Sequence, residues 1–152
     1  MKIIKQFIWI LLLFPSIAYG EVIGSVNTVF KLLGANDKIV IEAFDDPKVE
    51  GVSCHLSRAK KGGIKGTIGI AEDPSNSSIA CRQIGPIKYG DNLKEGEEVF
   101  TKNTSILFKT LHVVRFFDRK RHVLIYLVYS DKLVEGSPKN SISTVPIMPW
   151  KK

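Results

Sequence analysis

The stretch that decides the fold is a pair of apolar runs, Val113-Val114-Arg115-Phe116-Phe117 and Val123-Leu124-Ile125-Tyr126-Leu127-Val128. β-Branched and aromatic residues fill both runs, and these residue types are enriched in strands. The charged segment Asp118-Arg119-Lys120-Arg121 lies between them and predicts the turn of an antiparallel hairpin. Because both faces of each run are apolar, we expect central strands that are covered on both sides.

Similar runs extend on either side of this hairpin. The three C-terminal β-like runs are residues 98–101, 104–117 and 122–130. Residues 38–44 and 52–59 predict a second hairpin, joined by a polar loop that contains Asp45-Asp46-Pro47. Residues 142–150 contain Pro146 and Pro149, so we expect this segment to be extended rather than helical.

One segment predicts a helix. Asp73 followed by Pro74 is typical of a helix start, and Gly85-Pro86 is typical of a stop. The pattern predicts a short helix over about 74–83, with Cys81 on it, facing the strand of Cys54. The fold class is therefore a β-rich α+β single domain over residues 21–152, with an antiparallel sheet and one or two short helices.

The first 20 residues have the layout of a secretory signal peptide. Lys2 and Lys5 precede an apolar run over 7–14, a break follows at 15–16, and Ala18-Tyr19-Gly20 has small residues three and one positions before the expected cut. An uncleaved membrane anchor is the alternative, but the apolar run is shorter than the roughly 20 residues a spanning helix needs. We predict cleavage after Gly20, and therefore no stable membrane span in the exported protein.

The net charge of the chain indicates which class of partner to expect. The chain carries 22 basic and 15 acidic residues, a net charge of +7. Without Lys2 and Lys5 the segment 21–152 keeps a net charge of +5. An exported protein rarely meets nucleic acid, so we expect no nucleic-acid partner and look instead to an anionic ligand or an envelope protein. A soluble surface with a mild basic excess is the alternative interpretation.

Cys54 and Cys81 are the two cysteines of the chain, and both lie in the exported part. An even count in an oxidising compartment favours a structural disulfide. A redox pair or metal ligands are the alternatives. However, the spacing is not Cys-x-x-Cys and no second group of cysteines or histidines accompanies the pair. We predict a disulfide closing a loop of about 28 residues, worth roughly 3.5 kcal/mol in the chain-entropy model.

A basic, glycine-rich segment over residues 58–69 is the candidate binding site. Glycine-rich backbone with free N–H groups and nearby cations can hold an anion. The spacing does not match a nucleotide-binding loop. A solvated basic turn is the alternative interpretation. The candidate residues for anion or partner binding are Arg58, Lys60, Lys61, Gly62, Gly63 and Lys65.

No catalytic, cofactor or metal-binding residues are predicted. Ser57-Arg58-Ala59-Lys60 imitates a Ser-x-x-Lys motif, but odd spacing on a strand sends the two side chains to opposite faces. The three histidines lack metal-ligand spacing and are interpreted as hydrogen-bonded or exposed strand residues. The acidic pairs Asp45-Asp46, Glu72-Asp73 and Glu97-Glu98 are interpreted as solvated turn and cap residues.

Several long blocks carry a family resemblance. They are IGSVNTVF at 23–30, IEAFDDP at 41–47, SRAK at 57–60 with GGIKG at 62–66, YSDK at 129–132 and EGSPKN at 135–140. They resemble the CreA family of small exported proteins of Gram-negative bacteria, over essentially all of residues 21–152. The resemblance implies a periplasmic location and two cysteines placed like Cys54 and Cys81. It supplies no activity and no site residues.

Two hypotheses for the function follow. The first is a periplasmic binding or accessory protein that engages an anionic ligand or an envelope partner through the glycine–lysine segment or a sheet edge. The second is an envelope-acting enzyme whose active site the motifs do not reveal. The lack of a catalytic constellation favours the first. If the basic segment proves flat and solvated, the binding hypothesis has to move to a protein interface.

Overall fold

The computed structural model of the chain describes residues 18–63, 77–103, 110–131 and 139–151. These residues form strands and loops, with essentially no helix. The strands are β1 (Glu21–Val29), β2 (Asp37–Asp45), β3 (Val49–Lys60), β4 (Ser77–Tyr89), β5 (Glu97–Asn103), β6 (Thr110–Asp118), β7 (Val123–Ser130) and β8 (Asn140–Pro146).

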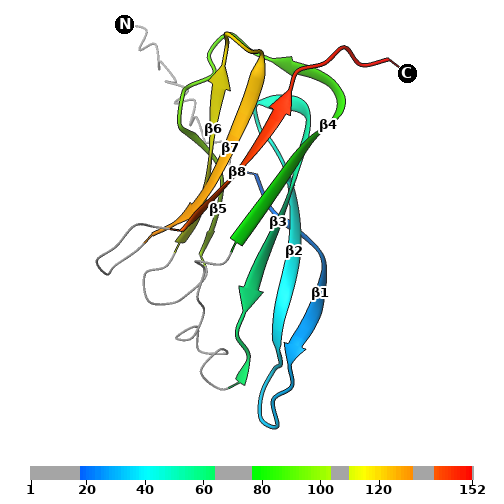
Figure 1. The fold of residues 1–152 in the computed structure, drawn as a ribbon, viewed down its shortest axis with the longest axis vertical. Helices are drawn as coiled ribbons and strands as arrows, with labels where there is room; N and C mark the ends of the chain where they lie inside the picture. The colour runs from blue at the N-terminus through cyan, green and yellow to red at the C-terminus, as the bar shows by residue number, and fades with distance from the viewer. Residues whose placement is uncertain (1–17, 64–76, 104–109, 132–138, 152) are drawn as a thin grey trace, which may run out of the picture.

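Two antiparallel sheets of four strands each make up the fold (Figure 1). Sheet A has the order β1-β2-β3-β4, and sheet B has the order β5-β6-β7-β8. The sheets approach each other where β4 runs beside β8 and β7 (Figure 1). The strand β1 lies at the far edge of sheet A, where β2 is its one partner among the described strands.

One shared core joins the two sheets. Along β7, buried side chains alternate with half-buried ones, as expected for a strand with one face in a core. The ring of Phe44 from sheet A stacks on that of Phe100 from sheet B, with 4.4 Å between centroids. The core residues are Phe44, Val49, Val52, Cys54, Leu56, Ile79, Cys81, Leu93, Val99, Phe100, Leu111, Val113, Phe117, Leu124, Tyr126, Val128 and Val145.

Both predicted hairpins are confirmed. Strands β2 and β3 pair from Lys38 opposite Lys60 to Asp45 opposite Ser53. Strands β6 and β7 pair from Leu111 opposite Ser130 to Asp118 opposite Val123. Residues 104–109 of the predicted run 104–117 lie outside the described residues. The expectation that these strands are covered on both sides is wrong, because the outer face of β7 is only half-buried.

The predicted helix over about 74–83 is also wrong. Residues 77–83 belong to strand β4, and 74–76 lie outside the described residues. In β4 the buried Ile79 and Cys81 alternate with exposed neighbours, which is the period of a strand. Pairing with β3 therefore overrides the local helix-start signal, because it places Ile79 and Cys81 in the core.

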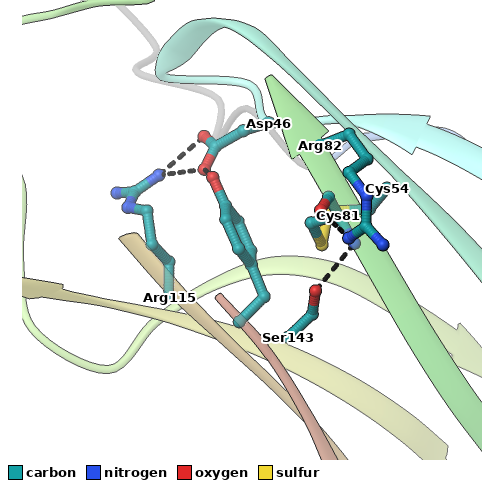
Figure 2. The surroundings of a disulfide bond; sticks show 7 residues. Asp46, Cys54, Cys81, Arg82, Arg115 and Ser143 are labelled. Carbon is teal, nitrogen blue, oxygen red and sulfur yellow. Dashed lines mark hydrogen bonds and ion pairs between the residues drawn. A yellow bond between two sulfur atoms is a disulfide. The ribbon is translucent and has the colours of Figure 1, made fainter. Parts of the chain in front are cut away.

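The two cysteines form a disulfide, as the cysteine count predicted. Cys54 of β3 is opposite Cys81 of β4 in the register, and the S–S distance is 2.06 Å. Both residues are fully buried. Figure 2 shows that the backbone N–H of Cys81 donates to Ser143 Oγ at 2.8 Å, so β8 of sheet B is attached at this point. The bridge joins two strands of sheet A, beside the closest approach of the sheets.

The expected signal peptide falls almost wholly outside the described residues, which begin at Ala18. The backbone N–H of Ala18 donates to the carbonyl oxygen of Val99 in β5 at 3.2 Å. A Cβ added to Gly20 would lie 2.8 Å from the ring of Phe100, so this segment passes close over the core. In the part of the chain that the structure describes, no helix is long and apolar enough to cross a membrane.

Candidate interaction surface of sheet A

The outer face of sheet A carries exposed apolar side chains on the adjacent strands β1 and β2. Along β2 every second residue from Val40 is buried, and Ile39 and Ile41 alternate with these and are exposed. Val26 of β1 is opposite Ile39 in the register, so both side chains point to the same outer face. Val26 keeps 64% of its surface exposed. We call Val26, Ile39 and Ile41 the apolar strip.

A shallow hollow of about 230 Å³ adjoins the apolar strip. Ile41 is shared by the two features. The hollow spans β2, β3 and β4 because His55 is opposite Ala80 and Ser57 is opposite Ser78 on these strands. Small side chains leave the space, and the lining carries hydroxyl groups and one imidazole. This lining suits a partner segment that inserts an apolar side chain and also makes a hydrogen bond to the hollow. The lining residues are Ile41, His55, Leu56, Ser57, Ser78, Ile79 and Ala80.

The candidate residues of the basic segment lie in different environments in the structure. Lys60 and Lys61 are exposed at the end of β3. The N–H of Gly62 donates to Asp37 Oδ1 at 2.7 Å, and the N–H of Gly63 donates to the carbonyl oxygen of Ala35 at 2.6 Å. Lys65 lies outside the described residues. The two glycine amides are therefore already engaged by the neighbouring turn of this chain.

Asp37 is the anion at this turn. The Gly62 N–H, followed by the ammonium groups of Lys31 and Lys61, holds the pKa of Asp37 below its ordinary value. Lys31 Nζ lies 3.3 Å from the Asp37 carboxylate. The backbones meet so closely that a Cβ on Gly62 would lie 1.8 Å from the carbonyl oxygen of Ala35, which explains the glycine. The turn thus offers lysine ammonium groups to a partner, rather than a ring of free amides.

Arg58, the remaining candidate cation, points into the protein. Its Nε donates to Glu42 Oε2 at 3.0 Å, and both side chains are buried. Lys102 of sheet B reaches the same carboxylate at 3.0 Å. Burial alone would raise the pKa of Glu42, but the hydrogen bonds and charges of Arg58 and Lys102 outweigh it and hold the pKa below its ordinary value. Arg58 is therefore engaged by Glu42 within sheet A, and the Lys102–Glu42 pair links the two sheets.

Asp46 forms a second buried charge network between the sheets (Figure 2). Arg115 Nη1 donates to both of its oxygens, at 2.6 and 2.8 Å, and the Tyr126 hydroxyl donates at 2.8 Å. The N–H groups of Lys48 and Val49 also donate to Asp46 Oδ1. Burial, and then the Asp46 charge, raises the pKa of Tyr126. The interpretation of Asp46 as a solvated turn residue is wrong.

This network was not predicted from the sequence, although charged residues inside apolar runs indicate buried ion pairs. Arg115 interrupts an apolar run that was itself predicted to be buried, and a buried guanidinium requires an anionic partner. Glu42 stands in the same way within the apolar run over 38–44. Glu97, interpreted as solvated, is the second acceptor of Arg115, at 2.5 Å, and also pairs with Lys48.

His112 lies on the outer face of sheet B between two carboxylates. Its Nδ1 is 2.6 Å from Glu98 Oε2, its Nε2 is 3.1 Å from Asp131 Oδ2, and its ring stacks on Tyr129. Burial would lower the pKa of His112, but the two carboxylates outweigh it and raise the pKa above its ordinary value. Both ring nitrogens are thus engaged, which fits the prediction of a hydrogen-bonded strand histidine.

The described residues contain no group of three His, Cys, Asp or Glu side chains that could hold a metal ion. Within the same ranges, every buried side-chain nitrogen and oxygen has a hydrogen-bond partner. The buried charges are thus structural, and the hollow with the apolar strip is the candidate functional surface.

Comparison with known proteins bears on the family. A family model described as CreA protein matches residues 23–150. The chain belongs to the CreA family. It is 58% identical over 145 residues to Protein CreA of Escherichia coli strain K12, covering 93% of this chain and 92% of that protein. Protein CreA of the O6:H1 and O157:H7 strains gives the same values. No solved structure matches the chain. The CreA resemblance found in the sequence is therefore confirmed.

Proposed function

We propose that this CreA-family chain is a periplasmic accessory protein that binds an envelope protein through the outer face of sheet A. The hollow beside the apolar strip carries the proposal. Exposed apolar side chains next to a concave apolar site are typical of a protein-binding surface. Ile41 belongs to both features, so a single partner segment could cover them together.

Export through the N-terminal signal is part of this proposal. The expected cleavage point precedes Glu21, which is the first residue of β1, so the mature chain keeps all eight described strands. Cleavage would remove Ala18 and its hydrogen bond to Val99, but no side chain of a described strand. The disulfide also suits an oxidising compartment.

A protein partner fits the basic turn better than a small anion does. Among the described residues of the turn, the Gly62 and Gly63 amides already donate to Asp37 and Ala35 and are therefore not available as the paired free amides of an anion nest. Lys61 remains exposed just beyond β3, four positions after Ser57 of the hollow, whereas Lys60, at an odd spacing from Ser57, lies on the opposite face of the strand. Partner carboxylates at that end would add attraction and orientation. We therefore expect a partner segment with an apolar side chain and nearby acidic residues.

Binding is also favoured over catalysis at this surface. A nucleophile is activated by a base within hydrogen-bond reach. His55 makes no hydrogen bond to Ser57 or Ser78 in the described structure, although the three side chains line one hollow. The hollow is also shallow, whereas active sites are usually deep enough to exclude water.

The test is affinity capture from a periplasmic extract with the mature chain as bait. In Ala80→Arg, a long charged side chain would occupy the hollow from an exposed strand position. Ile142→Arg is the matched control, since Ile142 is exposed on sheet B. We expect wild type and Ile142→Arg to retain the same envelope protein and Ala80→Arg to lose it. Capture that is indifferent to Ala80→Arg would contradict the proposal.

A further inference from the structure

The edge strand β1 carries an interaction surface distinct from the hollow. It is exposed along nearly its whole length, and of the described strands only its inner neighbour β2 pairs with it. Val22 and Ile23 are 60% and 56% exposed, comparable to Val26 at its centre. An edge strand of this kind presents unpaired N–H and C=O groups together with apolar side chains, and it can pair with another strand.

The composition of β1 lacks the residues that usually prevent an edge strand from pairing with another strand. Natural edges carry lysine, proline, inward-pointing charges or β-bulges that discourage pairing. From Val22 to Phe30 the chain has no charged residue and no proline. Register irregularities occur between Val22 and Gly24 and between Asn27 and Val29. They leave the central residues 24–27 in regular register, so the middle of the strand is suited to pairing.

The charges at the ends of β1 indicate what pairs with it. Glu21 begins the strand, and Lys31, which follows it, is partly exposed while it pairs with Asp37 of its own chain. In an antiparallel pair of two copies, the first residue of each strand comes beside the last residues of the other. Each Glu21 would then approach Lys31 of the second copy, with apolar residues facing each other between them. A parallel pair would instead place like charges together, which is unfavourable.

We propose that two copies of this chain associate by antiparallel pairing of β1 with β1, about a two-fold axis near Val26. The two sheets A then form one continuous sheet of eight strands. A two-fold axis between antiparallel strands is perpendicular to the sheet, so both hollows face the same side. An interface of this kind is self-complementary, because the same strand serves both copies. The inference goes beyond the proposed function, since it involves the backbone edge of β1 and shares only Val26 with the surface proposed for the envelope partner.

The first test is the mass of the mature chain in solution, by light scattering and by sedimentation over a concentration series. We expect twice the mass of one chain at high concentration. Val26→Lys adds an edge charge of the protective kind and should yield the monomer at concentrations where wild type is dimeric. Ile142→Lys is the matched control, because Ile142 is 60% exposed on β8, the edge strand of sheet B, and it should leave the dimer intact.

A second test distinguishes this pairing from a folding defect. A residue on the two-fold axis is opposite itself, so Val26→Cys should form an intermolecular disulfide under mild oxidation. Ile142→Cys should crosslink much more slowly, and the native cysteines are already bridged to each other. A wild-type chain that is monomeric throughout, or equal crosslinking at the two positions, would overturn the inference. Partner capture by a monomeric chain would leave the proposed function standing, so the two failures are distinguishable.

Discussion

Arg115 of β6 donates two hydrogen bonds from a single nitrogen, Nη1, to the carboxylate of Asp46, at the end of the β2–β3 hairpin. The two residues belong to different sheets and are 69 positions apart in the chain. Both side chains are almost fully buried. Four donor groups make five hydrogen bonds to the Asp46 carboxylate in total, when the Tyr126 hydroxyl and two backbone N–H groups are included. This network holds one hairpin of sheet A against sheet B.

Removal of Arg115 should destabilise the protein strongly. Arg115→Met retains the length of the side chain but leaves the Asp46 carboxylate without its cation in a buried site. We expect the free energy of unfolding to fall by about 3–5 kcal/mol, measured by urea denaturation. The control is Arg121→Met, which breaks the exposed pair with Asp118 and should cost less than about 1 kcal/mol. Equal losses of unfolding free energy in the two variants would show that the buried network stabilises the protein no more than the exposed pair does.

The disulfide should contribute through the closed loop between Cys54 and Cys81. Replacing both residues by alanine should lower the free energy of unfolding by roughly 3.5 kcal/mol. Wild type denatured in the presence of reductant should match the double variant. Titration of the unfolded, unreduced wild type should find no free thiol, and two titratable thiols would refute the bridge.

Glu42 should make stability fall in acid. Its folded-state pKa lies below the ordinary 4.5, because the pairing with Arg58 and Lys102 outweighs burial. The ionised carboxylate therefore contributes stability above about pH 4.5, and this contribution is lost as the pH falls through the folded-state pKa. Urea denaturation at successive pH values should show a smaller loss on acidification for Glu42→Gln than for wild type. An identical loss would assign the acid sensitivity to other groups.

His112 should titrate above its ordinary 6.5, because Glu98 and Asp131 both stabilise the imidazolium. Its contribution to stability is complete below about pH 6.5 and is lost as the pH rises through the folded-state pKa. NMR titration of the His112 ring should show a lower pKa in Glu98→Gln and in Asp131→Asn. Asp45→Asn, which removes an exposed carboxylate elsewhere, should leave the titration unchanged. A pKa insensitive to both substitutions would contradict the two-carboxylate arrangement.

The contact between two turns should make Gly62 irreplaceable. Gly62→Ala would force a Cβ to 1.8 Å from the carbonyl oxygen of Ala35, so one turn must move and the Asp37 hydrogen bond is strained. We expect a loss of about 2–3 kcal/mol, at the upper end of the usual range for single substitutions. Gly24→Ala is the control, since nothing lies within 4 Å of its added Cβ, and it should change stability by less than about 0.5 kcal/mol. Calorimetric melting curves of both variants provide the measurement.

Local patterns predicted most of the strands correctly. The alternation in 52–59 and the apolar runs flanking 118–121 depend on side chains a few positions apart, and period-2 patterns reveal such a strand directly. The error over 74–83 has the same origin. Asp73-Pro74 is a valid local signal for a helix start. The pairing of β4 with β3, which places Cys81 in the core, outweighs that signal, and local sequence patterns carry no information about this pairing.

The site could be predicted only in part. The segment 58–69 was identified by its cations and glycines, yet in its described part Arg58 faces Glu42 and the Gly62 amide faces Asp37. Whether a glycine amide is free depends on which turn packs against it, and that turn is about 25 residues earlier in the chain. The hollow involves three strands, so no single stretch of sequence could indicate it.

By itself, the sequence determined most of the strand-forming segments, the two hairpins, the pairing of the two cysteines and the family, because each depends on local periodicity, count or similarity. Only the tertiary structure decided that Asp46 is buried against Arg115, that the basic turn contains its own anion, and that the outer face of β2 remains exposed beside a bare edge strand. The physical reason is that the contribution of a charge or an apolar side chain to stability or binding depends on what surrounds it. Those surroundings come from segments that are distant in the chain and meet only when the two sheets pack.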